Sequence, residues 1–356
     1  MTVRDTTVWL DREPSAPPRS AGSLGVRTRR PSRDRAIRTE VVSVHRPPTR
    51  GLRAWSSRHP VTTFLVLAFA IAYPAMSVPI LADHGVIPGG WMPNLRGLDT
   101  ERIASVLLVF VALLPAALWT TWAADGQTGV RALVSRMFRW QFGARWWILV
   151  LAGLPTLTVG LALLLGDTFE PVDVAPFVLT QLMGLLVNLL LINMWEETAW
   201  SGVVQTRLER RHGLVAAALL TAVPFALVHM PLHFIGDFSI GSLTTALVTL
   251  LIVCAFVRLM IGVFLRGARD SILAVALVHT LFNRSNNEEG VVAGLLEGDG
   301  RKLAGLLAVL LLTALVATVS RRRLSRSYRL GLDSTAASTA ARSATSTTTT
   351  TKKDQP

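Results

Sequence analysis

Eight long apolar blocks decide what this chain of 356 residues can fold into. A bilayer-spanning helix needs about 20 mostly apolar residues, and a soluble core cannot absorb so many blocks of that length. Composition agrees, with 51% hydrophobic and only 17% charged residues. We therefore predict an all-α, polytopic membrane bundle of about eight transmembrane helices. The expected spans are about 61–82, 103–124, 146–165, 176–195, 214–232, 243–265, 271–283 and 303–319.

The formal net charge of +13 belongs to the two ends of the chain and not to the apolar body, residues 59–320. Residues 1–58 are rich in Arg and Pro, and residues 321–356 are rich in Ser and Thr. Neither end has apolar periodicity, so we expect both to be disordered tails. The lipid bilayer is the expected partner of this membrane body, and nothing predicts a nucleic-acid partner. We interpret the basic N-terminal tail as a solvated segment that helps to fix the orientation, with attraction to anionic lipid head groups as the alternative. The single cysteine, Cys254, excludes an intramolecular disulfide framework and a zinc-thiolate cluster.

The loops between the spans alternate in charge, which predicts an orientation. Alternate loops are neutral or acidic, while the intervening ones are rich in Arg. Because positive loops stay on the cytoplasmic side, we expect a multi-pass cell-membrane protein with both termini in the cytoplasm. The basic stretch 129–147, which has three Trp near one end, predicts an interfacial helix along the inner leaflet. The Arg residues of these loops are Arg131, Arg136, Arg139 and Arg145, then Arg207, Arg210 and Arg211, then Arg266 and Arg269.

The seventh block is too short to cross the membrane. It has about 11 apolar residues before Asn283 and Arg284, whereas the hydrocarbon core is about 30 Å thick. A short, polar-interrupted segment at membrane depth must be sheltered by protein or must line a cavity. We therefore expect a site beside it.

Several ionisable side chains lie inside the spans, where they are costly and by default mark function. They are Glu196 and Glu197, His229, His279 with the nearby Asn283, and Arg258. We expect Arg258 to snorkel inward or to pair with an acid, and we give it no catalytic role.

Spacing predicts that three helices bring these groups to one depth. Glu196 and His229 are each about 16 residues from the turn near Gly213, which places both about 24 Å above it, provided that the fourth helix continues to about Glu209. His279 and Asn283 are four residues apart, so they share one helix face. We predict one polar pocket near mid-membrane, in which these faces point toward each other.

Such a pocket suits peptide-bond hydrolysis without a Ser or Cys nucleophile. A Glu with a His can deprotonate water, and a second His with an Asn can stabilise an oxyanion. Glu196, His229 and His279 are also a common zinc complement, so one divalent metal such as zinc is a second interpretation. The chain has no His-Glu-x-x-His motif, and Pro231 interrupts the helical spacing of His229 and His233.

These segments resemble the three signature motifs of the CPBP family, the intramembrane CAAX proteases and bacteriocin-processing proteins, also called the Abi or type II CAAX prenyl endopeptidase family. The motifs are Glu196-Glu197-x-x-Trp200-x-Gly202, Phe225-x-x-x-His229 and His279-x-x-x-Asn283. The resemblance covers roughly residues 130–320, the expected protease-like core. It implies an endopeptidase, often called a metalloprotease, that acts on a peptide or membrane-protein substrate. It also implies that Glu196 activates water with the help of His229, that His279 and Asn283 stabilise the oxyanion, and that Glu197 supports the site.

One position departs from the family pattern. The first motif usually has Arg where this chain has Ser201, and that Arg would support the acidic pair electrostatically. A catalytically inactive scaffold or bacteriocin-immunity-type protein, which binds a peptide or membrane partner, is therefore the alternative function. A small-molecule transporter is a third hypothesis, which the absence of an inverted repeat in the span pattern disfavours.

Overall fold

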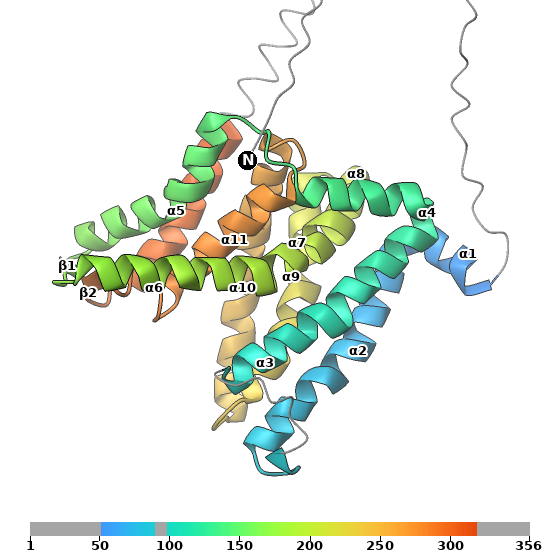
Figure 1. The fold of residues 1–356 in the computed structure, drawn as a ribbon, viewed down its shortest axis with the longest axis horizontal. Coiled ribbons are helices and arrows are strands. Elements are labelled where there is room, and N and C mark those ends of the chain that lie inside the picture. Colours follow the sequence, from blue (N-terminus) through green and yellow to red (C-terminus); the bar gives the residue numbers. More distant parts are fainter. Residues whose placement is uncertain (1–50, 90–97, 319–356) are drawn as a thin grey trace, which may run out of the picture. The chain divides into compact units, whose positions relative to one another are not determined.

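The computed structural model describes residues 51–89 and 98–318, which fold almost entirely as helices. Within these ranges the only sheet is a two-stranded antiparallel pair, β1 (Thr168–Phe169) with β2 (Leu296–Glu297). The helices are α1 (Gly51–Arg58), α2 (Pro60–Asp83), α3 (Thr100–Leu107), η2 (Leu108–Leu113), α4 (Leu114–Met137), α5 (Ala144–Leu164), α6 (Val174–Val187), η3 (Asn188–Asn193), α7 (Met194–Ala199), η4 (Trp200–Gln205), α8 (Thr206–His212), α9 (Leu214–His229), η5 (Met230–Phe234), α10 (Ile240–Gly267) and α11 (Ile272–Asn286) (Figure 1). A further helix runs over Arg301–Thr318.

The expected membrane bundle is confirmed. Among the described residues, seven helices are long and apolar enough to cross a bilayer. They correspond to seven of the eight apolar blocks, and the remaining block forms α11, whose 15 residues are fewer than the roughly 20 that a full crossing of the hydrocarbon core needs. The chain is therefore membrane-embedded and multi-pass.

The expected tail ending at residue 58 is wrong at its boundary. Residues 51–58 form α1, in which Ala54 and Ser56 are buried. Arg53 in this helix lies over the ring of Trp122, 4.2 Å from its centroid, so a cation–π contact holds α1 against α4. The rest of the N-terminal tail and residues 319–356 lie outside the described residues.

The expected interfacial helix is shorter than predicted. Gly126 has φ 66° and ψ −164°, a conformation open to glycine, and it divides α4 into two helical segments that run in different directions (Figure 1). We call residues 127–137, which follow this break, the interfacial segment. α5 begins at Ala144, so Trp146 belongs to a spanning helix, where it is buried against Phe264.

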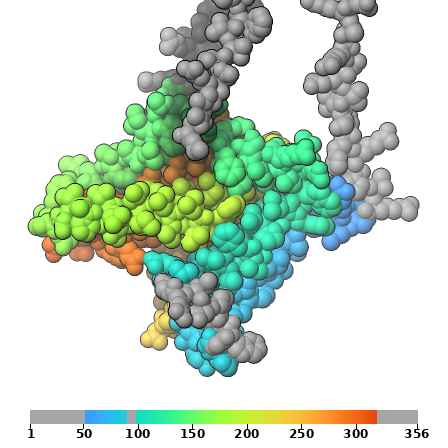
Figure 2. All heavy atoms as spheres, viewed as in Figure 1, coloured from blue at the N-terminus to red at the C-terminus, as the bar shows by residue number. Residues whose placement is uncertain are grey.

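Small side chains let the helices approach closely. Ala68 and Ala72 of α2 are fully buried, as is Ala112 of η2 on the helix that packs against it. Transmembrane helices associate through such small residues because apolar side chains gain little by leaving lipid. By contrast, α6 has no buried residue, and its apolar side chains form a ridge on the surface in Figure 2.

The two sets of loops gather at opposite ends of the helices, as the charge alternation predicted. At the end that we call the Arg-rich end, Arg136 donates to the Asp270 carbonyl at 3.1 Å and Arg139 donates to the Arg269 carbonyl at 2.5 Å. At the other end, which we call the acidic end, Asp83 accepts from Thr100 at 3.1 Å, and Arg102 pairs with Glu289 at 2.9 Å.

Candidate active site

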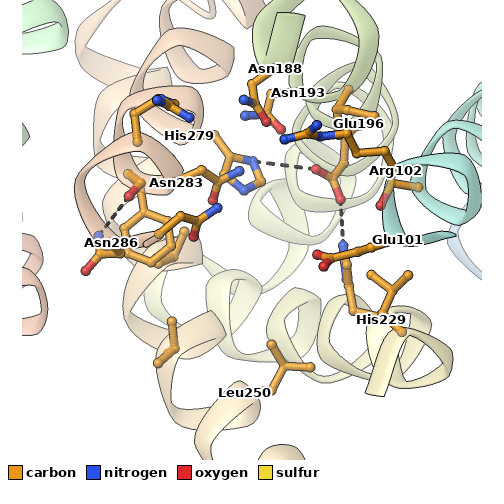
Figure 3. A pocket seen from close by; sticks show the side chains of 18 of the residues that line it. Glu101, Arg102, Asn188, Asn193, Glu196, His229, Leu250, His279, Asn283 and Asn286 are labelled. Atoms are coloured by element: carbon orange, nitrogen blue, oxygen red, sulfur yellow. Dashed lines mark hydrogen bonds and ion pairs between the residues drawn. The ribbon is translucent and has the colours of Figure 1, made fainter. Parts of the chain in front are cut away.

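Three helices bring the predicted polar residues together (Figure 3). Nε2 of His229, at the end of α9, lies 3.0 Å from Oε1 of Glu196 in α7. Nδ1 of His279, in α11, lies 2.8 Å from Oε1 of Glu197 and 3.8 Å from Oε2 of Glu196. The three helices therefore do converge on one polar pocket. Figure 3 shows Asn283 on the His279 side of this pocket, as their spacing predicted.

The two glutamates sit on a short α-helical piece between two π-helical turns. η3 precedes α7 and η4 follows it, so the chain from Val174 to His212 is one continuous helical rod with two irregular turns. Each π turn adds a residue to the helix and turns the following side chains, and such turns are common at functional sites. The rod continues to His212, well past Glu196, as the depth argument required.

His229 presents one ring nitrogen to Glu196 and the other to a backbone carbonyl. The ring nitrogen Nδ1 of His229 lies 2.7 Å from the Phe225 carbonyl, which can only accept, so Nδ1 carries a hydrogen. Its other ring nitrogen, Nε2, lies 3.0 Å from Oε1 of Glu196, close enough for a proton to pass between the two groups. The pair is therefore arranged to pass a proton between carboxylate and imidazole.

Glu197 has a full set of partners. Arg258 of α10 donates to both of its oxygens, at 2.9 Å and 3.0 Å, and Ser201 donates to Oε2. His279 is a further donor, through Nδ1. Arg258 and Glu197 are both 0% exposed. The expectation that Arg258 snorkels or pairs with an acid is confirmed in its second form.

An aromatic ring packs the two histidines. The ring centroid of Phe225 lies 4.7 Å from that of His229 and 5.9 Å from that of His279. Trp200 packs edge-on against Phe225 at 5.4 Å, and the Arg258 guanidinium lies 5.0 Å from the same ring. Phe225 of the second motif, supported by Trp200 of the first, thus packs directly against the two histidine rings.

Glu196, His229, His279 and Asn283 all line one cavity of about 650 Å³. Its apolar wall comes from α10, with Leu250 and Val257 among its members. Sequence reasoning missed Asn193, which also lines the cavity and donates to Thr280 at 3.0 Å. Its fully buried position on the face of Glu196 and Glu197 is clear only from the three-dimensional packing. At the acidic end the cavity is lined by Asp99, Glu101, Arg102 and residues 286–289.

The residues proposed as metal ligands do not form a metal site as they are placed. His229 directs Nε2 to Glu196, and His279 directs Nδ1 to Glu197. Among the residues that the structure describes, no group of three or more His, Cys, Asp or Glu side chains is arranged to hold a metal ion. Each glutamate is instead engaged by a histidine, so we derive no step through a metal.

Comparison with known proteins supports the motif assignment. Residues 178–285 match the family model described as type II CAAX prenyl endopeptidase Rce1-like. No curated protein and no solved structure matches the chain. The matched range contains all three motifs and Arg258, and it ends just after Asn283. The resemblance indicated by the motifs is thus confirmed over residues 178–285, the part of this membrane-embedded chain that is similar to the Rce1-like type II CAAX prenyl endopeptidase family.

Proposed function

We propose that this chain is an intramembrane endopeptidase, which hydrolyses a peptide bond of a membrane-associated substrate with water activated by Glu196 and His229. The observation that carries the proposal is the 3.0 Å contact between Glu196 and His229, inside a cavity that His279 and Asn283 also line. The family match supports a CAAX-protease-like activity.

The first step is attack by water. The Glu196 carboxylate, with the ring of His229 beside it, accepts a proton from a water molecule in the cavity. The resulting hydroxide adds to the carbonyl carbon of the scissile bond, which forms the new C–O bond and leaves a negative charge on the carbonyl oxygen. Desolvation by the surrounding apolar helices strengthens each electrostatic contact in the cavity.

The second step is stabilisation and collapse of this tetrahedral intermediate. The Asn283 side-chain amide donates to the oxyanion, and His279 does so through Nε2 when it carries both ring protons. Nδ1 of His279 faces Glu197 at 2.8 Å, so Nε2 is the ring nitrogen left for the oxyanion. Collapse breaks the C–N bond, and the leaving amine takes the proton that the Glu196–His229 pair had accepted.

The position of the cavity supports substrate access from the acidic end. Asp99, Glu101 and Glu289 line it there, and no Arg of the Arg-rich end is among its lining residues. At the Arg-rich end Arg136 donates to the Gly202 carbonyl at 3.3 Å and to Thr206 at 3.2 Å, which ties the interfacial segment onto η4 and α8. With Arg-rich loops in the cytoplasm of a cell-membrane protein, the cavity opens on the non-cytoplasmic side.

Reconstituted vesicles test both parts of this proposal. Purified protein is inserted into liposomes, sorted by orientation, and given a peptide library outside, with products identified by mass spectrometry. We expect cleavage by the wild type and none by Glu196→Gln, and only when the acidic end faces the peptides. Cleavage only when the Arg-rich end faces outside would contradict substrate access from the acidic end, but it would still support the endopeptidase activity. Absence of cleavage in both orientations would contradict the proposed endopeptidase activity.

The scaffold alternative rests on Ser201 in place of the motif Arg. The loss of the motif Arg is a weaker reason to expect an inactive protein, because Arg258 supplies a guanidinium to Glu197 of the acidic pair from another helix. A scaffold would keep its partner after Glu196→Gln, whereas a protease would lose its products, so the same variant separates the two functions.

A further inference from the structure

Arg258 is a fully buried charge of the described residues that the proposed reaction does not use directly. It lies in the middle of α10, is 0% exposed, and is one of the largest fully buried side chains of the described ranges. A buried guanidinium without partners would cost several kcal/mol, so its contacts show what it is there for.

All three guanidinium nitrogens of Arg258 are engaged by one helical rod. Nη1 and Nη2 donate to the two oxygens of Glu197, and Nη2 also donates to Ser201 at 2.7 Å. Nε donates to the side-chain oxygen of Gln205 at 3.0 Å, and the Gln205 amide donates back to the Arg258 carbonyl at 2.9 Å. Glu197, Ser201 and Gln205 follow one another at intervals of four residues and therefore form one stripe of that rod.

The stripe links Arg258 to the histidine of the third motif. The two-pronged contact fixes the plane of the Glu197 carboxylate, because a guanidinium fork matches a carboxylate only when the two are coplanar. That same carboxylate accepts from Nδ1 of His279 at 2.8 Å. With Nδ1 held in this way, Nε2 of the ring is turned to the cavity. Arg258 thus acts on the ring through Glu197 and does not touch the reacting atoms.

We propose that Arg258 is a positioning residue that replaces, from α10, the arginine that the first motif lacks at position 201. Ser201 lies four residues after Glu197, where an arginine side chain would reach the same carboxylate from within its own helix. Because Ser201 is small, the space is left for a guanidinium that arrives from the neighbouring helix, and its hydroxyl donates to Glu197. Ser201 and Arg258 are therefore a matched pair.

The competing explanation is purely structural. Arg258 and Glu197 could simply neutralise each other and fasten α10 to α7, with no effect on the orientation of His279. The proposal rests on the proposed endopeptidase function, so its test needs one readout that follows catalysis and another that does not.

The test compares four variants with the wild type: Arg258→Gln, Arg258→Ser, the neutral pair Glu197→Gln/Arg258→Gln, and the exchange Ser201→Arg/Arg258→Ser. Removing the partner that orients a metal-bound histidine typically costs about 10- to 100-fold in activity. We expect a loss of the same order in kcat for each single variant, with a smaller change in KM. We expect the neutral pair to regain thermal stability but not kcat. We expect the exchange to recover at least about tenfold of the loss relative to Arg258→Ser.

Two outcomes would overturn the proposal. A neutral pair with wild-type kcat would show that Arg258 only offsets the burial of Glu197. An exchange variant that folds as stably as the wild type, yet is no more active than Arg258→Ser, would show that the guanidinium is not interchangeable between the two positions.

The readout independent of catalysis is the ¹⁵N resonance of His279 Nδ1 in bilayers. In the wild type and in the exchange variant, we expect the ¹⁵N chemical shift typical of an Nδ1–H that donates to a carboxylate. In Arg258→Gln and in the neutral pair, we expect a different ¹⁵N chemical shift. An unchanged shift in both would refute the positioning role. If the wild type cleaves nothing but the shifts follow this pattern, the endopeptidase function fails and the positioning role stands.

Discussion

Gly202 offers a quantitative test of how the rod that carries the glutamates packs. A Cβ added at this position would lie 2.6 Å from Cδ1 of Leu133 in the interfacial segment and 3.0 Å from Cδ1 of Ile272 in α11. Optimal carbon–carbon separations are about 3.5–4.0 Å, so both side chains would have to move. The glycine of the first motif therefore marks the place where the interfacial segment and α11 meet η4.

Gly202→Ala should destabilise the fold by about 1–3 kcal/mol, the usual cost of overpacking a filled core. For a chain of this size each kcal/mol lowers the melting temperature by about 2–4 °C, so we expect a fall of about 2–12 °C. Cys254 is the sole cysteine and is buried, so a thiol-reactive fluorescent dye reports unfolding in detergent without further labelling.

Two variants control this measurement. Gly160→Ala, in α5, places a Cβ with nothing within 4 Å and should not lower the melting temperature. Adding Leu133→Ala to Gly202→Ala makes room for the new methyl group, so the double variant should lose less stability than the sum of the two single changes. A Gly202→Ala protein that melts with the wild type, or strictly additive effects with Leu133→Ala, would refute the close contact.

Three further outcomes are expected. In a Cys254→Ser background, cysteines that replace Glu196 and His229 should crosslink with a short reagent, because the native side chains approach to 3.0 Å. A Glu196→Cys/His212→Cys pair, whose positions are about 24 Å apart along the helix, should not crosslink. Equal crosslinking yields for the two pairs would disprove the convergence of α7 and α9. Asn283→Asp should lower kcat by about 10²–10³-fold with little change in KM, because it removes the amide donor to the oxyanion, and an unaltered kcat would remove Asn283 from the oxyanion site. Purified active protein should hold no stoichiometric metal and should keep its activity in chelator; stoichiometric zinc that disappears in a His229/His279 double variant would overturn the metal-free mechanism.

Much of the fold was predictable because membrane helices obey simple length rules. Each apolar block became a helix, and the shortest became α11, whose 15 residues are fewer than a full membrane span needs. Helical rise is fixed, so the common depth of Glu196, His229 and His279 followed from counting residues. The family motifs added the expected roles, and the match over residues 178–285 confirmed the resemblance.

What could not be predicted depends on helix rotation and local irregularity. Spacing along α10 gives the depth of Arg258 but not the side to which it points, so its contact with Glu197 was only one of two expectations. The π turns η3 and η4 have no distinct sequence signal, because the residue types that they contain also occur in the α-helices of the described chain. The break at Gly126 likewise depends on a backbone conformation that many glycines never adopt.

The proposed protease activity depends on Glu196 above all other residues. The most direct measurement compares protein termini in membranes of the native host, with wild-type protein against Glu196→Gln at matched abundance. We expect termini that occur only with the wild type, and these termini should lie within or beside membrane segments on the non-cytoplasmic side. Identical sets of termini under several growth conditions would contradict the proposed activity and would favour a scaffold that keeps the same fold.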